Sequence, residues 1–390
     1  MSKLKTKLHL LPLGILFTLL TWQGEMMGVS NPPYRRFRIM TYNVENLFDT
    51  LHAEGKLDKE FTPLGSRKWD SRKYWRKQGQ LCRVIAGVGG IAPADLVALV
   101  EVENDSVISH LTERTKLRRL GYQYVITHGE DLRGINVALL YQPHRFKLCQ
   151  QDSLRVPPLS NKQRQTRDVL HIAGELVTGD TLDLFICHLP SRREGRMAER
   201  YRERIMQRLR TYTDSLFRTR QKPSIILTGD FNAWYPERCF TRDLNVLLTP
   251  GTSTHPSSRT ENGKTTLVPD TLTAFSPHQL YLLTYKKEAR NHIRGTYKFQ
   301  GEWNQLDHFI ISGNLLNHAT QTPPITPFTT MHNCRIVDFP FLLQKRKEWR
   351  RSTPLPYLPW YVSPRRIQRP FTPNFRPLLL STQTTRTYTQ

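Results

Sequence analysis

Cysteine is scarce in this 390-residue chain, and long apolar runs are almost absent. Its five cysteines are scattered without the spacing of a metal site, and five thiols cannot all pair. A chain of this length buries a sizeable core without disulfides or metal, so the cysteines say little about function. One apolar run, residues 8–20, is shorter than the ~20 residues that a membrane-spanning helix needs, and no other stretch could span a membrane.

Acidic residues are also few, since 33 Asp and Glu stand against 57 Lys and Arg and leave a formal charge of +24. Apolar residues make up 38% of the chain, which indicates one large globular domain or two ordinary ones rather than a disordered chain. The positive charge suggests an anionic partner such as nucleic acid, phosphate esters or a membrane surface. Net charge concerns association, however, and does not identify a reaction.

The N-terminus resembles an export signal. Lys3, Lys5 and Lys7 precede the apolar run at 8–20, which has the length of a signal-peptide core. Because Pro12 interrupts the run and no A-x-A-like cleavage site follows, a buried N-terminal helix is the alternative. We expect a signal over residues 1–28, a monomer that is periplasmic, cell-surface or secreted, and no membrane anchor other than an uncleaved signal.

Short apolar segments alternate with helical ones from Phe37 onward, and no internal repeat is found. A helix between Cys187 and Ser224 is predicted by apolar residues at three- and four-residue steps, and a second over 71–88. The segments predicted as strands, rich in β-branched and aromatic residues, are 37–43, 95–101, 122–127, 135–141, 182–188, 224–230 and 306–312. Strands interleaved with helices indicate an α/β layered fold with a sheet or paired sheets inside.

Polar residues stand where four of these strands end: Asn43, Glu101, His188, and Asp230 with Asn232. Since ligands gather at the carboxyl ends of strands in layered α/β folds, these side chains could converge on one site. Carboxylate and amide oxygens suit Mg²⁺, and a histidine with arginines would bind a phosphate ester. Each residue also has a plain alternative as a turn cap, a solvated strand end or an Asx-turn.

Six segments, in this order, resemble the endonuclease/exonuclease/phosphatase superfamily, which is deoxyribonuclease I-like. They are TYNVENLFD (41–49), DLVALVEVEN (95–104), RGINVALLY (133–141), CHLPSRREG (187–195), LTGDFNA (227–233) and QLDHFIIS (305–312). The bacterial exported branch, which also has a segment similar to YKFQGEW (297–303), is the most similar. The resemblance implies a four-layer α/β sandwich with two packed β-sheets over residues 29–343, and Mg²⁺- or Mn²⁺-assisted hydrolysis.

The resemblance also implies residue roles. Glu101 matches the main metal ligand and Asn43 a second metal-site position. Asp230 and Asn232 match the pair that orients the attacking water and holds the scissile phosphate. His188 matches a phosphate-contacting histidine that stabilises the transition state.

Other residues near these motifs have two interpretations. Arg133, before GINVALLY, and Arg192, after the HLPS turn, are predicted to bind substrate, although Arg192 could equally belong to a solvated basic helix face. Glu45 and Glu103 could support the site or form surface salt bridges. Asn136 stands where the family often has Asp, which puts one supporting hydrogen bond in doubt.

The family pattern ends in a segment resembling GGFSDHLP, and no SDH occurs in this chain. Asp307 matches the acid that orients the histidine of that segment. His308 is a poor substitute for it, because alternation along a strand points neighbouring side chains to opposite faces.

Residues 344–390 hold ten Lys and Arg, one acidic residue, seven prolines and no glycine, with no sustained helical or strand period. One permitted coding of residues 360–373 reads GMSHRGGFSDHLP in the second frame. We therefore hypothesise a frameshift between about 343 and 354, so that out-of-frame translation replaces the final strand. This basic, Pro-rich tail would then account for +9 of the net charge, against +2 in residues 1–28 and +13 in the body.

The leading hypothesis is an endonuclease or exonuclease that hydrolyses phosphodiester bonds by Mg²⁺-assisted attack of water, with nucleic acid or another phosphodiester as substrate. Loss of the C-terminal Asp-His pair would leave it with low or no activity. A phosphatase or phospholipase-like hydrolase of sugar or lipid phosphates is the second hypothesis, because the same core serves both. A catalytically silent protein that binds phosphate or nucleic acid is the third.

Overall fold

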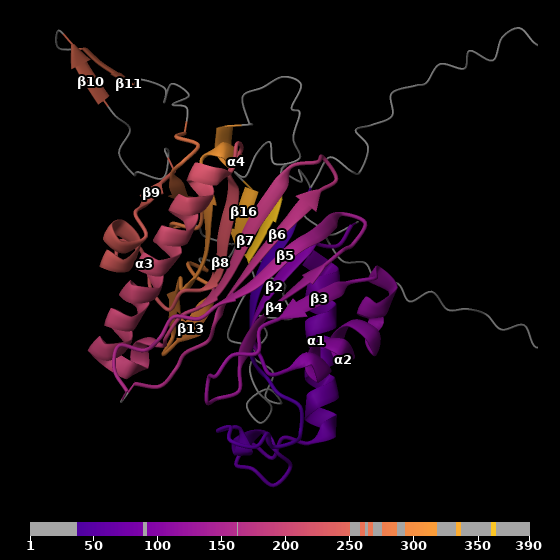
Figure 1. Cartoon of the computed structure of the whole chain (residues 1–390). Coiled ribbons are helices and arrows are strands. Elements are labelled where there is room, and N and C mark those ends of the chain that lie inside the picture. Colours follow the sequence, from indigo (N-terminus) through magenta and orange to yellow (C-terminus); the bar gives the residue numbers. More distant parts are fainter. Residues whose placement is uncertain are drawn as a thin grey trace, which may run out of the picture. The chain divides into compact units, whose positions relative to one another are not determined.

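Two large β-sheets pack face to face, and helices cover the outer face of each (Figure 1). This architecture, in a computed structural model, confirms the predicted four-layer α/β sandwich. The structure describes residues 37–88, 92–161, 163–249, 258–261, 264–267, 275–286, 293–317, 333–336 and 360–363. The predicted signal at 1–28 and the predicted frameshift position near 343–354 lie outside these ranges.

One sheet has six strands in the order β16-β17-β1-β2-β4-β3. Its strands are β1 (Ile39–Leu47), β2 (Leu96–Val102), β3 (Gln123–Ile126), β4 (Asn136–Tyr141), β16 (Asn333–Ile336) and β17 (Trp360–Ser363). Strands β1 and β2 are parallel and every other pair is antiparallel. The parallel pair brings the ends of β1 and β2 to the same edge.

The other sheet has seven strands in the order β5-β6-β7-β8-β15-β12-β9. Its strands are β5 (Phe146–Leu154), β6 (Val169–Leu176), β7 (Thr181–His188), β8 (Ser224–Asp230), β9 (Val246–Leu248), β12 (Leu280–Leu282) and β15 (Asp307–Ser312). Strands β7 and β8 are parallel, and β15 runs antiparallel to β8. Two hairpins stand apart from both sheets: β10 (Ser258–Glu261) with β11 (Lys264–Leu267), and β13 (Tyr297–Phe299) with β14 (Glu302–Asn304).

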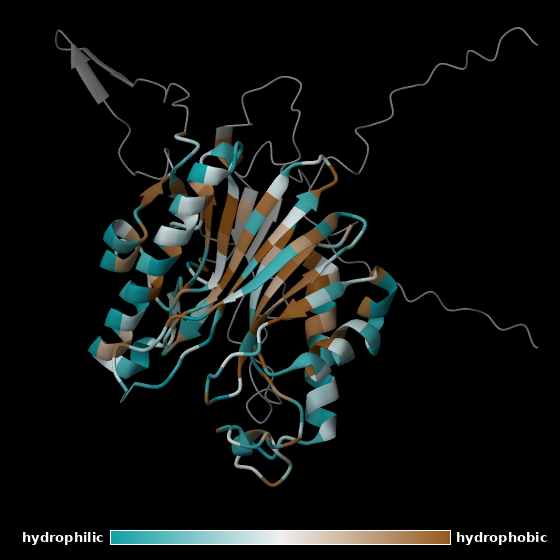
Figure 2. Ribbon diagram, viewed as in Figure 1, coloured by the Kyte–Doolittle hydropathy of each residue, from teal (hydrophilic) through white to brown (hydrophobic). Residues whose placement is uncertain are grey.

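Three apolar clusters form the core between these layers. One fills the space between the two sheets, one lies under helices α1 and α2, and one lies under α3. Figure 2 shows the apolar residues on the sheets and the polar residues on the outward side of α3. The helices are α1 (Ser71–Val88), α2 (Asp105–Glu113), α3 (Gly195–Thr219) and α4 (Asn314–Asn317), with short helical turns η2 (Lys59–Phe61), η3 (Lys116–Leu120), η4 (Arg192–Glu194) and η5 (Cys239–Asp243).

The seven predicted strands correspond to β1, β2, β3, β4, β7, β8 and β15, and both predicted helices are present. Strands β5 and β6 were not predicted. Most of β5 is exposed and polar, and β6 carries His171 and Gly174 within its apolar run. Both patterns hide the alternation by which a strand is recognised in a sequence.

Strand β17 was not predicted either, because its four residues are too few to show a period. It lies between β1 and β16 and is antiparallel to both, with Ile39 opposite Val362. The tail thus contributes one short strand to the six-stranded sheet. Within the part of the chain that the structure describes, no helix is long and apolar enough to cross a membrane.

Candidate active site

Five strands bring polar side chains from both sheets to one place. In the seven-stranded sheet, Asp230 at the end of β8 lies opposite His188 of β7 and Asp307 of β15. Asn43 of β1 and Glu101 of β2 come from the other sheet. All five residues are buried. The sandwich therefore gathers side chains that are up to 264 positions apart in the sequence (307 − 43).

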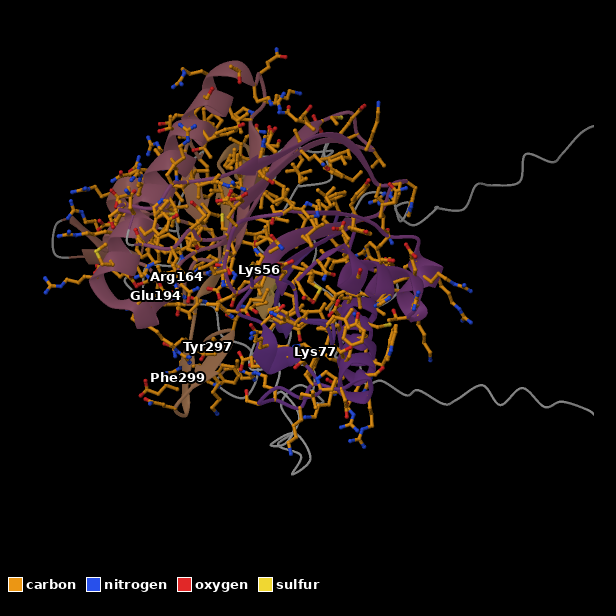
Figure 3. The ribbon with its side chains drawn as sticks, turned by 60° about the horizontal axis from the view of Figure 1, so that its bottom comes forward. Lys56, Lys77, Arg164, Glu194, Tyr297 and Phe299 are labelled. Atoms are coloured by element: carbon orange, nitrogen blue, oxygen red, sulfur yellow. The ribbon has the colours of Figure 1, made fainter. Side chains whose placement is uncertain are left out.

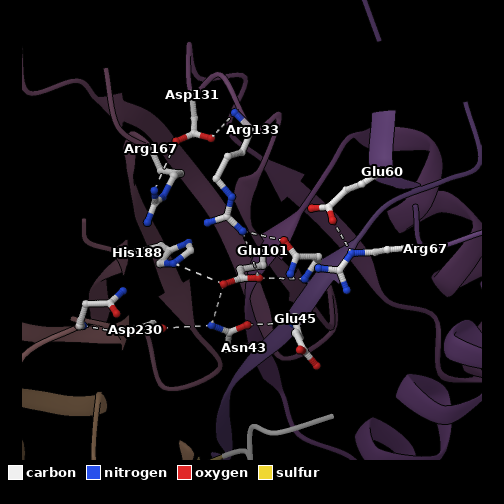
Figure 4. Close-up of polar contacts among 12 residues, drawn as sticks. Asn43, Glu45, Glu60, Arg67, Glu101, Asp131, Arg133, Arg167, His188 and Asp230 are labelled. Atoms are coloured by element: carbon white, nitrogen blue, oxygen red, sulfur yellow. Dashed lines mark hydrogen bonds and ion pairs between the residues drawn. The ribbon is translucent and has the colours of Figure 1, made fainter. Parts of the chain in front are cut away.

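Asn43 links the two sheets through its amide (Figure 4). Its Nδ2 donates to Asp230 Oδ2 at 3.1 Å and to Glu101 Oε1 at 3.3 Å. His188 Nε2 lies 3.7 Å from the same Glu101 oxygen. We call these four residues the central cluster; they are residues that the sequence singled out.

The backbone is strained beside the central cluster. Glu101 has φ +67°, and Asn46, with φ +55°, donates its N–H to Glu101 Oε2 at 2.9 Å. Asn232 has φ +48°. Left-handed backbone at non-glycine residues costs about 1–3 kcal/mol each and concentrates at functional sites.

Asp230 and Asn232 form the Asx-turn that the sequence allowed, and they also belong to the site. Asn232 donates its N–H to Asp230 Oδ1 at 2.8 Å and its Nδ2 to Leu189 O at 2.9 Å. Burial raises the pKa of Asp230 to about 7, the Asn232 hydrogen bond opposes it, and the charge of Glu101 adds to it. The turn fixes one carboxylate oxygen and leaves the other facing Asn43.

His188 is neutral in this environment. Burial lowers the pKa of its imidazole well below the usual value, and the charges of Arg167 and Arg133 lower it further. Its Nδ1 has no hydrogen-bond partner within the described residues. A neutral imidazole keeps one ring N–H, which can donate to a phosphate oxygen.

The two arginines near His188 differ in how firmly they are held. Arg133, which the sequence predicted, donates to Asn46 Oδ1 at 2.7 Å and lies 3.9 Å from Glu101 Oε2. Arg167 was missed, because it precedes the unrecognised strand β6. It is buried and donates to Asp131 at 3.3 Å and to Leu189 O at 2.9 Å. Together they place two positive charges beside the carboxylates.

Arg192 lies outside the central cluster. It is ion-paired with Glu237, and its guanidinium stands 3.8 Å from the centroid of the Trp234 ring. Its contacts show more than a solvated helix face, and substrate binding by Arg192 stays a prediction.

Asp307 is buried near the carboxylates of Asp230 and Glu101, and no basic side chain of the described residues pairs with it. Its Oδ2 accepts a hydrogen bond from Thr296 Oγ1, and its Oδ1 has no partner in the described part of the chain. Burial raises its pKa well above the usual value, and the charge of Asp230 adds to this. His308 points away, as expected, since its ring nitrogens contact Thr284 Oγ1 at 2.8 Å and Ala233 O at 2.9 Å.

Glu45 and Glu103 lie beside the cluster rather than in surface salt bridges. Burial raises the pKa of each to about 8, and Lys77 opposes the shift at Glu45. Glu103 Oε2 accepts from Asp49 N at 2.6 Å. Asn136, the departure from the family pattern, donates to Glu103 O at 2.7 Å and so still supplies a supporting hydrogen bond.

The donor set fits a hard divalent cation held by few protein ligands. No three Asp, Glu, His or Cys side chains converge on one point within the described ranges. Mg²⁺ is commonly held by one or two carboxylates, with water and substrate phosphate completing its shell. Glu101 provides such a carboxylate. Asn43 presents Nδ2 to Glu101 and its Oδ1 accepts from the Glu45 N–H at 2.9 Å, so its oxygen would join the ligand set with the amide turned over.

The chain is similar to solved structures, and the first of the three that follow agrees with this fold. The humanized TDP2 of D. rerio has a TM-score of 0.50 at 15% identity, covering 84% of this chain and 98% of that chain. An endonuclease/exonuclease/phosphatase family protein from Bacteroides thetaiotaomicron has a TM-score of 0.48 at 15% identity, covering 84% of this chain and 94% of that chain. The human Nocturnin catalytic domain has a TM-score of 0.44 at 17% identity, covering 84% of this chain and 94% of that chain.

A search of curated protein sequences gives no match. Residues 38–249, more than half of the chain, match the model of one family and include the whole central cluster. The family's members are hydrolases of phosphodiesters or phosphate esters. The chain belongs to the endonuclease/exonuclease/phosphatase family.

Proposed function

We propose that this protein is an exported, monomeric, metal-dependent phosphodiesterase that acts on nucleic acid. The observation that carries the proposal is the meeting of Glu101, Asn43 and Asp230 with a neutral His188 across two sheets. Carboxylates that would hold a cation thus lie beside donors that would hold a phosphate. Export rests on the sequence pattern of residues 1–28 alone.

The chain's own residues divide the work of hydrolysis. Glu101 and Asn43 would hold the cation, which when bound supplies positive charge to the phosphate oxygens and lowers the pKa of water. Asp230, fixed by Asn232, would accept a hydrogen bond from the attacking water and orient it. His188 would donate its ring N–H to a phosphate oxygen on which charge accumulates.

The rate is expected to be low for this family. No histidine contacts Asp307 within the described ranges, so the group expected to act beside it is not supplied there. A general acid/base group contributes about 10²–10⁴-fold to rate. We therefore expect slow hydrolysis in which Glu101, Asp230 and His188 remain necessary.

The test measures hydrolysis of bis(p-nitrophenyl) phosphate and nicking of plasmid DNA by the purified full chain with Mg²⁺ and with EDTA. We expect turnover with Mg²⁺ only, and a loss of at least about 100-fold in Glu101→Gln. Glu175→Gln is the matched control and should retain full turnover. Glu175 is an exposed acid on β6 that pairs with Lys147 of β5.

Mn²⁺ binding, followed by electron paramagnetic resonance, reports on Glu101 without turnover and should weaken in Glu101→Gln alone. Hydrolysis that persists in EDTA contradicts the proposal. Release of phosphate from monoesters without cleavage of any diester replaces it with a phosphatase. Absence of both reactions contradicts the proposal and favours a catalytically silent protein that binds phosphate or nucleic acid.

A further inference from the structure

Two exposed aromatic rings lie against arginines on one side of the site. Trp234, 39% exposed, carries the Arg192 guanidinium over its ring at 3.8 Å. Phe299, 43% exposed, has the Arg193 guanidinium 5.7 Å from its ring centroid and stacks on Tyr297 at 6.1 Å. Arg192 and Arg193 are neighbours in η4, so this turn joins the two ring contacts, and we call the five residues the aromatic platform.

The aromatic platform adjoins the central cluster through the chain itself. Trp234 follows Asn232 by two residues, so their Cα atoms are within about 8 Å. Tyr297 directly follows Thr296, whose hydroxyl contacts Asp307. The same segments that position the site residues therefore continue into the platform.

A cavity of about 530 Å³ adjoins η4, whose Glu194 lines it. Three arginines, Arg133, Arg164 and Arg167, and a second acid, Asp131, also line it, which leaves an excess of positive charge. Figure 3 shows Arg164 and Glu194 close together on the face that also presents Tyr297 and Phe299. Arg167 is 95% buried as a side chain, and its Nε has no hydrogen-bond partner within the described residues. A buried N–H without a partner in an arginine-lined cavity is suited to an anion.

Aromatic faces beside a positively charged cavity are the features by which proteins hold single-stranded nucleic acid. A base stacked on an aromatic ring contributes without regard to sequence, while cationic groups follow the backbone. Within a duplex both faces of each base are already stacked, so a duplex leaves the platform unused. Arg192 is neutralised by Glu237 and therefore holds the ring of Trp234 rather than attracting phosphate.

We propose that the substrate is a single-stranded segment of a polynucleotide. Its bases stack on Trp234 and Phe299, and a phosphate beside the scissile one enters the cavity near Arg164 and Arg167. This inference rests on the proposed phosphodiesterase function and narrows its substrate class.

Binding of a fluorescein-labelled 12-mer of deoxythymidylate tests the platform, measured by anisotropy with the full chain in EDTA so that no turnover occurs. We expect the single strand to bind at least 10-fold more tightly than the same strand in a duplex. Trp234→Ala and Phe299→Ala should each weaken binding about 5- to 150-fold, the range for loss of one stacked base.

Trp234→Phe, which keeps a ring, should recover most of the affinity. Trp75→Ala is the matched control, since Trp75 on α1 is 37% exposed and packs against His110 away from the platform. Thermal unfolding shows whether each variant is folded. If Trp234→Ala does not fold, Phe299→Ala, in the exposed hairpin β13–β14, tests the platform in its place. Duplex binding as tight as single-strand binding overturns the inference, as does affinity within twofold of wild type in both alanine variants.

Salt dependence tests the cavity separately. For single strands the slope of log K against log salt is about −0.7 per phosphate contact, so Arg164→Ala should reduce its magnitude by about 0.7. Arg218→Ala, at the distant end of α3, should leave the slope unchanged. An unchanged slope in Arg164→Ala would show that no phosphate of the strand binds in the cavity.

Failure of the inference is distinguishable from failure of the proposed function. Wild-type hydrolysis of bis(p-nitrophenyl) phosphate reports on the phosphodiesterase alone, whereas anisotropy in EDTA reports on the strand alone. Hydrolysis without ring-dependent binding overturns only the single-strand inference. Ring-dependent binding without hydrolysis supports the inferred ligand and overturns the enzymatic function.

Discussion

Two buried aspartates of the seven-stranded sheet have opposite surroundings. Asp183 of β7 accepts from Arg220 at 3.0 Å and contacts His171 at 3.1 Å. Burial alone would raise its pKa, but these hydrogen bonds and charges hold the pKa of Asp183 below the usual value. Asp307 has no cationic partner within the described residues, and its pKa is raised. The same residue type is thus paired in one place and uncompensated in the other.

Asp307→Asn should therefore stabilise the protein by roughly 1–3 kcal/mol at pH 8, because it removes a buried acceptor charge that lacks a partner. A raised folded-state pKa means that wild-type stability falls as pH rises from the unfolded pKa toward the folded one. The gain should accordingly be larger at pH 8 than at pH 5, measured by urea unfolding. Asp183→Asn is the matched control and should cost about 3 kcal/mol; a loss of stability in Asp307→Asn as well would refute this account.

The contribution of His308 to stability should depend on pH in the opposite direction. Burial lowers the pKa of its imidazole from 6.5 to about 4, so between these values the unfolded chain binds the proton more tightly. Stability that is fully present above pH 6.5 should be lost as pH falls, by about 3 kcal/mol at pH 4. Urea unfolding of wild type and His308→Gln at pH 4.5 and 7.5 isolates this contribution, which the variant should lack. Equal pH dependence of the two proteins would show that another group is responsible.

At this scale the sequence placed Asn43, Glu101, His188 and Asp230 because each follows an apolar strand within a motif. Arg167 could not be found in this way, since nothing around it identifies a strand end. The contact between Arg192 of η4 and Trp234 joins residues 42 positions apart (234 − 192). No sequence pattern near either residue indicates it.

Between elements, β8 approaches β7 closely at Gly229, next to the site. Gly229 has φ +119°, and a Cβ built there would lie 2.1 Å from Cys187 O. Only glycine allows β8 to bring Asp230 opposite His188. The glycine of the GDFN motif is therefore a requirement of strand packing.

Gly229→Ala should lower the free energy of unfolding by more than about 3 kcal/mol or prevent folding. Gly79→Ala in α1, where an added methyl meets no atom within 4 Å, should instead stabilise by up to about 1 kcal/mol. Chemical unfolding of both variants gives the comparison. Tolerance of alanine at 229 would mean that β7 and β8 can separate without harm.

Among the elements, α1 was predicted with its observed bounds because its apolar residues recur at helical spacing over five turns. Strands β5 and β6 lack an alternating apolar pattern, and β17 is too short to have one. Their positions follow from pairing with neighbouring strands, which is tertiary information that local sequence does not contain.

For the whole molecule, the frameshift hypothesis makes a prediction at the level of the gene. The second reading frame of the coding DNA should contain a GGFSDHLP-like segment, and a chain with this frame restored should hydrolyse diesters about 10²–10⁴-fold faster. Comparison of the two purified chains with Mg²⁺ provides the measurement, and restored Asp-His replaced by Asn-Gln is the control. Absence of the segment from the second frame ends the hypothesis.

Asn43 and Asp307 lie on strands whose sequence positions are 264 residues apart (307 − 43), and the cluster needs both sheets in place. At about 5–20 residues per second, a ribosome takes roughly 13–53 s to pass from one to the other. During that interval a nascent chain contains β1 without the strands that complete its edge. Until β8 has been made, the nascent chain also lacks Asp230, and Asn43 has no carboxylate of the second sheet to contact.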